Sequence, residues 1–169
     1  GVHIINDISG GEMDDNMFAT VARLQVPYIM MHMRGTPETM MHDRYLHYND
    51  VVADVLQYFS VKIAHLVNMG VNDIILDPGL GFSKSLDDNY RLMQHLDEFT
   101  HIGLPLLVGI SRKSMIYKLL DITPAESLNG TTVLNVMALL GGANILRVHD
   151  VRQAVEAVKL VTKTLQCTH

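Results

Sequence analysis

Short apolar segments alternate with amphipathic segments along the whole chain. The apolar segments are Val2–Ile5, Tyr28–Met31, Ile74–Leu76, Leu106–Val108 and Asn144–Val148. Each is followed by residues with apolar positions three or four places apart, as in Val51, Val55 and Phe59, which is the spacing of an amphipathic helix. This alternation is typical of a parallel sheet covered by helices. It predicts an α/β fold of five strand–helix units in a single domain, residues 1–169.

Capping residues predict where several helices begin and end. Gly70 is expected at the C′ position of the helix that starts near Val51. The segment Thr123-Pro124-Ala125-Glu126 has Thr at the N-cap, Pro at N1 and Glu at N3, so a helix is expected to begin at Pro124 and to reach Leu140. Asp150 is expected to cap the last helix.

Two architectures fit five such units. One is a small doubly wound sheet, and the other is an incomplete (β/α)₈ barrel, since a complete barrel usually needs more than about 200 residues. Gly1 already stands next to the apolar segment predicted as the first strand, and the sequence has no initiator methionine. Chains seldom start inside a core strand, so we expect a fragment of a longer protein.

Composition narrows the class of function. Of the 169 residues, 48% are hydrophobic and 18% are charged, as in globular proteins. The formal net charge of −5 argues against nucleic-acid binding, which needs a basic face. There is no apolar run of about 18 residues and no secretory signal, so no membrane partner is expected. The single cysteine, Cys167, fits a reducing cytoplasm. These features favour a cytoplasmic protein that acts on a small molecule.

Polar residues stand where the predicted strands end. Asn6 follows the first strand, His32 the second, Asp77 the third, Lys113 the fourth, and Arg147 and His149 the last. Parallel strands place these ends on one face, where both candidate architectures bind ligands. An amide and a carboxylate suit the donor and acceptor edge of a heterocycle, whereas Arg147 and His149 suit an anionic group.

At these positions the chain resembles a known family. The resemblance rests on Ile5-Asn6-Asp7-Ile8-Ser9-Gly10-Gly11, Met31-His32-Met33-Arg34-Gly35-Thr36-Pro37, Leu76-Asp77-Pro78-Gly79-Leu80-Gly81-Phe82-Ser83-Lys84, Gly109-Ile110-Ser111-Arg112-Lys113-Ser114 and Arg147-Val148-His149-Asp150. In this order and spacing, the five motifs resemble those of dihydropteroate synthase. That family folds as a (β/α)₈ TIM barrel, so the chain resembles its fourth to eighth units.

The resemblance implies a pterin-binding role for one group of residues. Asp77 would accept hydrogen bonds from the ring N–H and the amino group of the pterin, and Asn6 would bond other ring nitrogens. Lys113 would donate to the pterin carbonyl and a ring nitrogen. Met31 and Phe82 would line the pocket beside the flat ring.

The resemblance implies that a second group of residues binds the diphosphate and p-aminobenzoate. Arg147 and His149 would hold the diphosphate, and Ser114 would meet the carboxylate of p-aminobenzoate. Gly109, which opens the fourth motif, is also expected to bind substrate. Lys113, Arg147 and His149 are the expected catalytic residues. In the family, diphosphate leaves the pterin methylene, a cation-like centre forms, and the arylamine nitrogen attacks it without an enzyme nucleophile.

The resemblance also implies features outside these motifs. The family uses Mg²⁺, whose asparagine ligand lies upstream of Gly1, so no metal ligand is expected in this chain. A further pterin-binding aspartate and two substrate-covering loops also precede Gly1. The family is a target of sulfonamides, and a homodimer is expected for the full-length parent. Ser83 and Arg34 depart from the family, which often has glycine and glutamine at these positions.

Several alternatives stay open at this stage. Corrinoid-dependent pterin methyltransferases share a pterin-binding barrel, although the fourth and fifth motifs resemble theirs less well. A separate alternative concerns activity: the chain by itself is either an impaired synthase or a non-catalytic pterin-binding fragment. Asp77 before Pro78-Gly79 also fits a simple turn aspartate. An incomplete barrel would expose two sheet edges, so we expect the isolated chain to self-associate.

Overall fold

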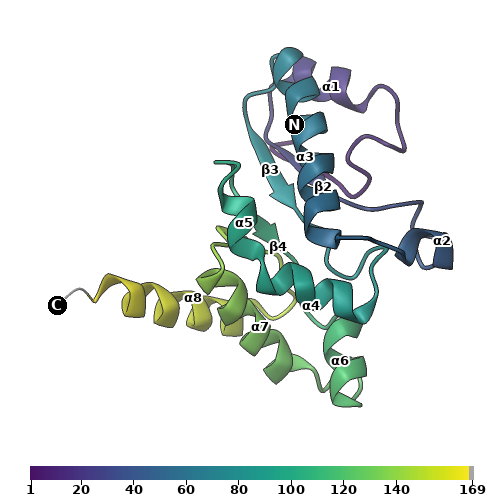
Figure 1. Cartoon of the computed structure of the whole chain (residues 1–169). Coiled ribbons are helices and arrows are strands. Elements are labelled where there is room, and N and C mark those ends of the chain that lie inside the picture. The colour runs from purple at the N-terminus through teal and green to yellow at the C-terminus, as the bar shows by residue number, and fades with distance from the viewer. Residues whose placement is uncertain (168–169) are drawn as a thin grey trace.

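The computed structural model describes residues 1–167 as strands and helices in regular alternation (Figure 1). The elements are β1 (Ile5–Asp7), α1 (Met17–Leu24), β2 (Tyr28–Met31), α2 (Asp43–Leu46), α3 (Val51–Asn68), β3 (Ile74–Asp77), α4 (Leu86–Gln94), α5 (Leu96–Thr100), β4 (Leu107–Val108), α6 (Ser114–Leu120), α7 (Leu128–Leu140), β5 (Ile145–Leu146) and α8 (Val151–Gln166). The predicted α/β class and the five strand–helix units are confirmed.

All strand pairings are parallel, and the strands follow one another in chain order. β1, β2 and β3 form one sheet, β4 pairs with β5, and a bridge between Leu76 and Leu106 joins the two groups. A doubly wound sheet would reverse its strand order at a switch point. The unbroken order is that of a barrel sector, so the structure favours the incomplete barrel over the doubly wound sheet.

The core lies between the strands and the helices that cover them. Tyr28, Met30 and Leu76 are fully buried on alternate strand positions, and Phe59 of α3 and Phe99 of α5 are also fully buried. Figure 1 shows α3 running alongside β2 and β3. All four residues of β2 are buried, and Ile74 and Leu76 of β3 are buried as well, so the core centres on these two strands.

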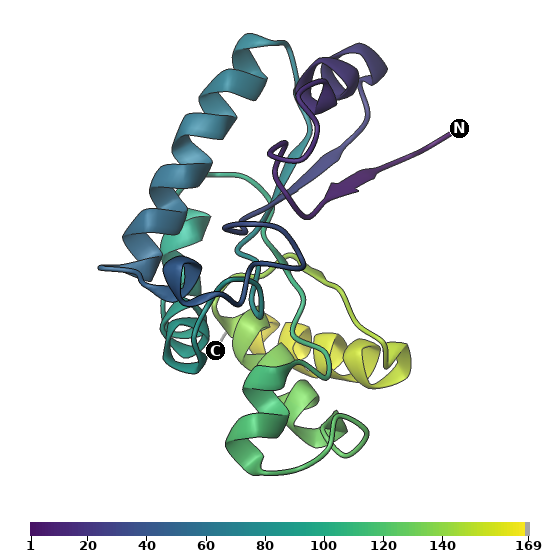
Figure 2. The same cartoon turned by 90° about the vertical axis from the view of Figure 1, so that its right-hand side faces the viewer.

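The first strand was predicted at Val2–Ile5, but it lies further along the chain and includes Asn6 and Asp7. Residues 1–4 are exposed and extend away from the sheet, and β1 begins only at Ile5 (Figure 2). Within the described part of the chain β1 pairs with β2 alone, so Val2 and Ile4 have no second neighbour to bury them. Their apolar character therefore does not make them part of the core.

Two further predictions need correction. α7 begins at Leu128 instead of Pro124, because Thr123 and Glu126 close a separate turn in which the Glu126 carboxylate accepts from Thr123 N and Oγ1 at 2.9 and 2.7 Å. The long loop after β2 also contains the short helix α2. No helix within residues 1–167 is both long and apolar enough to cross a lipid bilayer.

Candidate functional site

The candidate site lies on one face of the strands because their side chains alternate with a period of two. Asn6 is in register with Ile29, and Asp77 with Met31, two positions further along. The N–H of Arg147 donates to the carbonyl of Val108 at 3.0 Å, which places this arginine beside Gly109. Asn6, Asp77 and Arg147 thus share a face, although β1 and β5 lie at opposite ends of the strand order.

A network of hydrogen bonds joins these three side chains. Arg147 Nη2 donates to Asp77 Oδ2 at 2.7 Å and Arg147 Nη1 donates to Asn6 Oδ1 at 3.0 Å. The Asp77 side chain is only 2% exposed, whereas that of Arg147 is 38% exposed. The other carboxylate oxygen, Oδ1, accepts from Gly79 N at 2.8 Å. Asp77 is therefore both the predicted turn aspartate and a carboxylate with one oxygen turned toward the site.

The close approach of Arg147 depends on Gly109. A Cβ atom at this position would lie 3.0 Å from an Arg147 guanidinium nitrogen. With alanine here, the guanidinium would have to shift by a few tenths of an ångström. The role of Gly109 in substrate binding stays a prediction.

Lys113 enters the same space from the loop after β4. Its ammonium donates to the carbonyl of Leu80 and lies 4.5 Å from the centre of the Phe82 ring. Burial lowers the pKa of Lys113 to about 8, while the Asp77 carboxylate opposes that shift and Arg147 adds to it. The site thus gathers an amide, a carboxylate, an aromatic ring and two cations at the strand ends.

His149 lies in the loop after β5, and Arg112 lies in the loop after β4. His149 Nδ1 lies 3.1 Å from Ser111 Oγ, which also accepts from His149 N at 3.2 Å. Asp150 was expected to cap α8, but its carboxylate instead accepts from Arg112 Nε and Nη2 at 2.9 and 2.8 Å. This ion pair ties the loop after β4 to the start of α8 and so positions His149.

The remaining predicted residues lie close to this group. Met31 is 1% exposed, and its Cγ would be 3.3 Å from a Cβ atom on Gly79, so it forms the floor under the Asp77 loop. Ser114 is half-buried and is the first residue of α6, directly after Lys113. Of the predicted strand-end residues, Asn6, Asp77, Lys113 and Arg147 thus lie together. His149 contacts Ser111 instead.

The sequence analysis gave no role to Lys84 and expected His32 on the ligand-binding face, but the structure buries both side chains. His32 and Lys84 are both 3% exposed, and Lys84 Nζ lies 3.0 Å from His32 Nδ1. Burial, with a smaller contribution from the Lys84 charge, lowers the pKa of His32 well below its ordinary value. The sequence contained one signal for Lys84: it closes a loop that is otherwise made of Gly, Ser and apolar residues.

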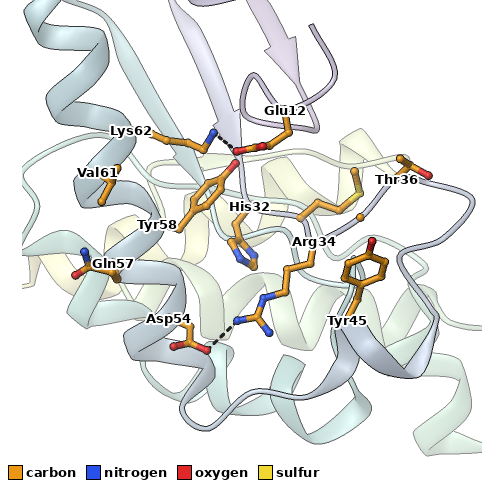
Figure 3. A pocket seen from close by; sticks show the side chains of 12 residues that line it. Glu12, His32, Arg34, Thr36, Tyr45, Asp54, Gln57, Tyr58, Val61 and Lys62 are labelled. Carbon is orange, nitrogen blue, oxygen red and sulfur yellow. Dashed lines mark hydrogen bonds and ion pairs between the residues drawn. The ribbon is translucent and has the colours of Figure 1, made fainter. Parts of the chain in front are cut away.

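A separate hollow of about 780 Å³ lies between α3 and the loops after β1 and β2 (Figure 3). Two ion pairs cross it, Lys62 with Glu12 at 2.5 Å and Arg34 with Asp54 at 2.9 Å. Its charged groups are therefore already paired with one another. It does not include the strand-end group around Asp77.

The residues present do not form a magnesium site by themselves. Within residues 1–167, no group of three or more His, Cys, Asp or Glu side chains is placed to hold a metal ion. The carboxylate of Asp77 is already shared by Gly79 and Arg147.

Comparison with known proteins agrees with this geometry. The family model of the pterin binding enzyme matches residues 1–149. The dihydropteroate synthase of Escherichia coli K12 is 45% identical over 167 residues, which cover 98% of this chain and 58% of that protein. The chain thus spans somewhat over half the length of this curated relative.

Solved structures show the same arrangement. A Yersinia pestis dihydropteroate synthase, in a complex with a sulfonamide drug, superposes with a TM-score of 0.94 at 40% identity and covers 99% of this chain and 61% of its own. The Thermus thermophilus enzyme bound to 4-aminobenzoate gives a TM-score of 0.91 at 38% identity, covering 98% of this chain and 67% of that one. The parallel strands of this chain therefore match part of the fold of these enzymes. The chain belongs to the pterin binding enzyme family, as its resemblance to dihydropteroate synthase indicates.

Proposed function

We propose that this chain is the C-terminal part of a dihydropteroate synthase, forming the fourth to eighth units of its (β/α)₈ barrel. The enzyme would condense 6-hydroxymethyl-7,8-dihydropterin diphosphate with p-aminobenzoate to give 7,8-dihydropteroate and diphosphate. One observation carries the proposal: Asn6, Asp77 and Arg147 come from distant strands and meet within hydrogen-bond distance. The relatives support it, since a Thermus thermophilus homologue is known in complexes with 6HMPPP and with 4-aminobenzoate.

The pterin would bind along the Asp77 side of the site. Asp77 Oδ2 faces the site, where a ring N–H and an exocyclic amino group would provide two donors. These donors compete with the Arg147 guanidinium, so binding requires Arg147 to share or release this oxygen. Asn6 lies beside it for other ring nitrogens, and Lys113 and Phe82 approach from the next loops. Met31 and Gly109 would complete the walls.

The diphosphate would bind near Arg147 and His149. Once displaced from Asp77, the 38% exposed guanidinium is free to turn toward an anion. His149 is exposed and held by Ser111, with the Arg112–Asp150 ion pair behind it. Two donors at this place would stabilise the charge that the leaving group gains. Ser114 would meet the carboxylate of p-aminobenzoate.

The reaction needs no nucleophile from the protein. The carbon–oxygen bond to diphosphate breaks with its electron pair and leaves a cation-like methylene centre, to which the lone pair of the arylamine nitrogen then bonds. The amine loses one proton to the released diphosphate or to water. Arg147, His149 and Lys113 act by positioning and by charge stabilisation, which together supply most of the acceleration of such substitutions. Any magnesium ion that the activity requires would take its protein ligand from outside this chain.

The proposal also concerns assembly and location. Apolar side chains on the packed helices α7 and α8, such as Val133, Met137 and Val155, are 45% to 51% exposed. This face would be covered by a second copy in a homodimer of the complete protein. The two open strand edges would pair with the missing barrel units, so the isolated chain would self-associate. The cytoplasm is the expected compartment.

A reconstitution experiment tests the proposal. The segment of the Escherichia coli relative that precedes the matched region would be joined before Gly1, giving a joined protein with eight units. We expect p-aminobenzoate-dependent release of diphosphate and formation of dihydropteroate. The 169-residue chain alone should turn over at less than about one hundredth of that rate, because it lacks part of the site. A folded joined protein that binds pterin but forms no product with p-aminobenzoate would contradict the synthase and favour a methyltransferase-type barrel.

A further inference from the structure

Lys84 holds its ammonium in a shell of backbone carbonyl groups behind the candidate site. It is 3% exposed, and its Nζ lies 3.0 Å from Gly79 O, 2.9 Å from Phe82 O and 3.4 Å from His32 O. A fourth contact joins it to His32 Nδ1 at 3.0 Å. Within the described residues, no carboxylate forms an ion pair with Lys84. The ammonium is therefore compensated by dipoles, nearly all from main-chain groups.

These contacts join two loops that carry predicted ligand groups. The N–H of His32 donates to the carbonyl of Asp77 at 3.0 Å, and a Cβ atom on Gly79 would lie 2.0 Å from the His32 carbonyl oxygen. The loop after β3 is thus pressed against the end of β2. Lys84 bonds to both sides of this contact and fixes the spacing between them.

The loop that Lys84 closes has little regular structure of its own. Gly79, Gly81 and Ser83 have φ values of 68°, 80° and 48°, so every second residue lies in the left-handed region. Such a backbone needs external hydrogen bonds to remain in one conformation. The carbonyls of Gly79 and Phe82 both turn inward to the Lys84 ammonium.

The ligand-binding groups lie on the opposite side of the same loop. The Asp77 carboxylate turns toward Arg147, and the Phe82 ring and the Leu80 carbonyl turn toward Lys113. Along this backbone, the carbonyls of Gly79 and Phe82 bond to Lys84, whereas the Leu80 carbonyl and the Phe82 ring contact Lys113. A change at the inner side must therefore displace the outer one.

We propose that Lys84 is a positioning residue for the pterin: its ammonium fixes the loop after β3 so that Asp77, Phe82 and Lys113 meet the ligand together. This inference rests on the proposed function of the same site. Lys84 itself is too deeply buried to touch a bound pterin. His32 accepts a hydrogen bond from Lys84 at Nδ1. Its imidazole lies between Tyr58 and Arg34 and lines the separate hollow beside α3 (Figure 3).

The state of the two side chains agrees with this arrangement. Burial lowers the pKa of Lys84 to about 7, while Asp77 opposes that shift. Burial keeps the pKa of His32 well below its ordinary value, so the imidazole is neutral and can accept a proton donor at Nδ1. Replacing Lys84 by an apolar side chain of similar length would remove the buried charge but leave carbonyl groups without donors.

The test compares Lys84→Met with a matched control, Lys62→Met, in the 169-residue chain. Lys62 is also a partly buried lysine that donates to a backbone carbonyl, that of Gly10 at 2.7 Å, but it lies outside the site. Hydrogen exchange followed by mass spectrometry reports on the loop, and titration with 6-hydroxymethyl-7,8-dihydropterin diphosphate reports on binding. Thermal unfolding monitors the global fold.

For Lys84→Met we expect amides of residues 77–84 to exchange about tenfold faster and the Kd for the pterin diphosphate to rise about 10- to 100-fold, the range seen when groups that orient metal ligands are removed. Lys62→Met should change exchange near Gly10 and leave the Kd within about twofold. A folded Lys84→Met with unchanged loop exchange or unchanged Kd would overturn the inference.

Two further outcomes are separable. If the parent chain and the joined protein both fail to bind the pterin diphosphate, the proposed function fails, whatever the loop does on mutation. If Lys84→Met does not fold, Lys84→Gln retains one amide donor and serves instead. A folded Lys84→Gln is expected to show the same loop-specific exchange and a smaller loss of affinity. Parent-like behaviour of that variant would also overturn the inference.

Discussion

β1 and β3 both end with a buried aspartate, Asp7 and Asp77, but their carboxylates are engaged differently. Asp7 accepts from Ser9 N, Ser9 Oγ, Gly11 N and Tyr28 Oη at 2.7 to 2.8 Å. Asp77 accepts from Gly79 N and from the movable side chain of Arg147. Asp7 points to the helix-covered face of the sheet and Asp77 to the opposite, inner face, because successive side chains along a strand point to alternate faces.

This difference separates a structural carboxylate from one available to a ligand. Every donor to Asp7 belongs to its own loop or to the core residue Tyr28, and each carboxylate oxygen already accepts two hydrogen bonds, so neither is available to a ligand. Asp77 keeps one oxygen that a ligand can gain by displacing a single partly exposed arginine. Each aspartate ends its strand, but Asp7 is in register with Met30 and Asp77 with Met31, so their side chains point to opposite faces of the sheet. Substitutions at the two loops should therefore have separable effects on stability and on binding.

Asp77→Asn should have the largest effect on activity. The amide removes the negative charge and one acceptor from a two-point contact, and hydrogen bonds to charged groups are worth about 1.5–3 kcal/mol. We expect kcat/KM for the pterin diphosphate in the joined protein to fall about 100-fold, equivalent to roughly 2.7 kcal/mol. Steady-state kinetics measure this. A fall of less than about threefold would mean that the Asp77 carboxylate does not bind the pterin.

Asp7→Asn should affect stability instead. Loss of the charged acceptor weakens several hydrogen bonds in a buried loop, so the free energy of unfolding should fall by about 2 kcal/mol. Urea denaturation measures the change, and pterin binding should stay within about twofold of the parent. A loss of binding that exceeds the loss of folded protein would remove the distinction between the two loops.

The same substitution has a pH signature. Burial alone would raise the pKa of Asp7, but hydrogen bonds from Ser9, Tyr28 and Gly11 outweigh it and hold the pKa below its ordinary value of 3.8. The folded state then binds fewer protons than the unfolded state at acidic pH. The stabilisation is complete above the ordinary pKa and is lost as pH falls through the folded-state pKa. The difference in stability between parent and Asp7→Asn should therefore shrink below about pH 4.

Lys113→Met should have an intermediate effect on binding. Lys113 bonds to the Leu80 carbonyl and lies beside Phe82 and Asp77, so its loss removes one donor to the pterin but leaves the loop closed by Lys84. We expect an increase in the Kd for the pterin diphosphate of about tenfold, or roughly 1.4 kcal/mol. Because burial lowers the pKa of Lys113, removing its charge should not lower the unfolding free energy. Exchange of residues 77–84 should stay near that of the parent, in contrast to Lys84→Met.

Much of this site could be predicted from the sequence because strand geometry is regular. Apolar segments gave the positions of β2 and β3, and the parallel arrangement brought Asn6, Asp77 and Arg147 to one rim. The resemblance to a family then supplied the type of ligand. The bounds of β1 were wrong because apolar character shows only which residues favour burial, and burial of Val2 and Ile4 requires a neighbouring strand.

Other features depended on contacts between residues far apart in sequence. A lysine that follows Phe82-Ser83 has the sequence context of a solvated loop residue, and only the fold encloses Lys84 with His32, 52 positions away. The Arg112–Asp150 pair spans 38 positions and draws Asp150 away from its expected role as a helix cap. The start of α7 was misplaced because a capping-box pattern also closes an isolated turn. Local patterns do not distinguish these outcomes.

Ser83→Gly should have the smallest effect and tests how the loop after β3 tolerates its backbone. Ser83 is fully buried with φ of 48°, a conformation that costs a non-glycine residue about 1 kcal/mol, so glycine would relieve strain. The substitution also removes Ser83 Oγ, which accepts from Arg34 N at 2.8 Å, a bond worth about 1 kcal/mol. These two terms nearly cancel, so the unfolding free energy should change by less than about 1 kcal/mol. The Tyr48 hydroxyl still donates to the Ser83 backbone carbonyl at 2.9 Å, which keeps the loop in place. A rise of more than about threefold in the Kd for the pterin diphosphate would show that the Ser83 side chain, as well as Lys84, orders the loop.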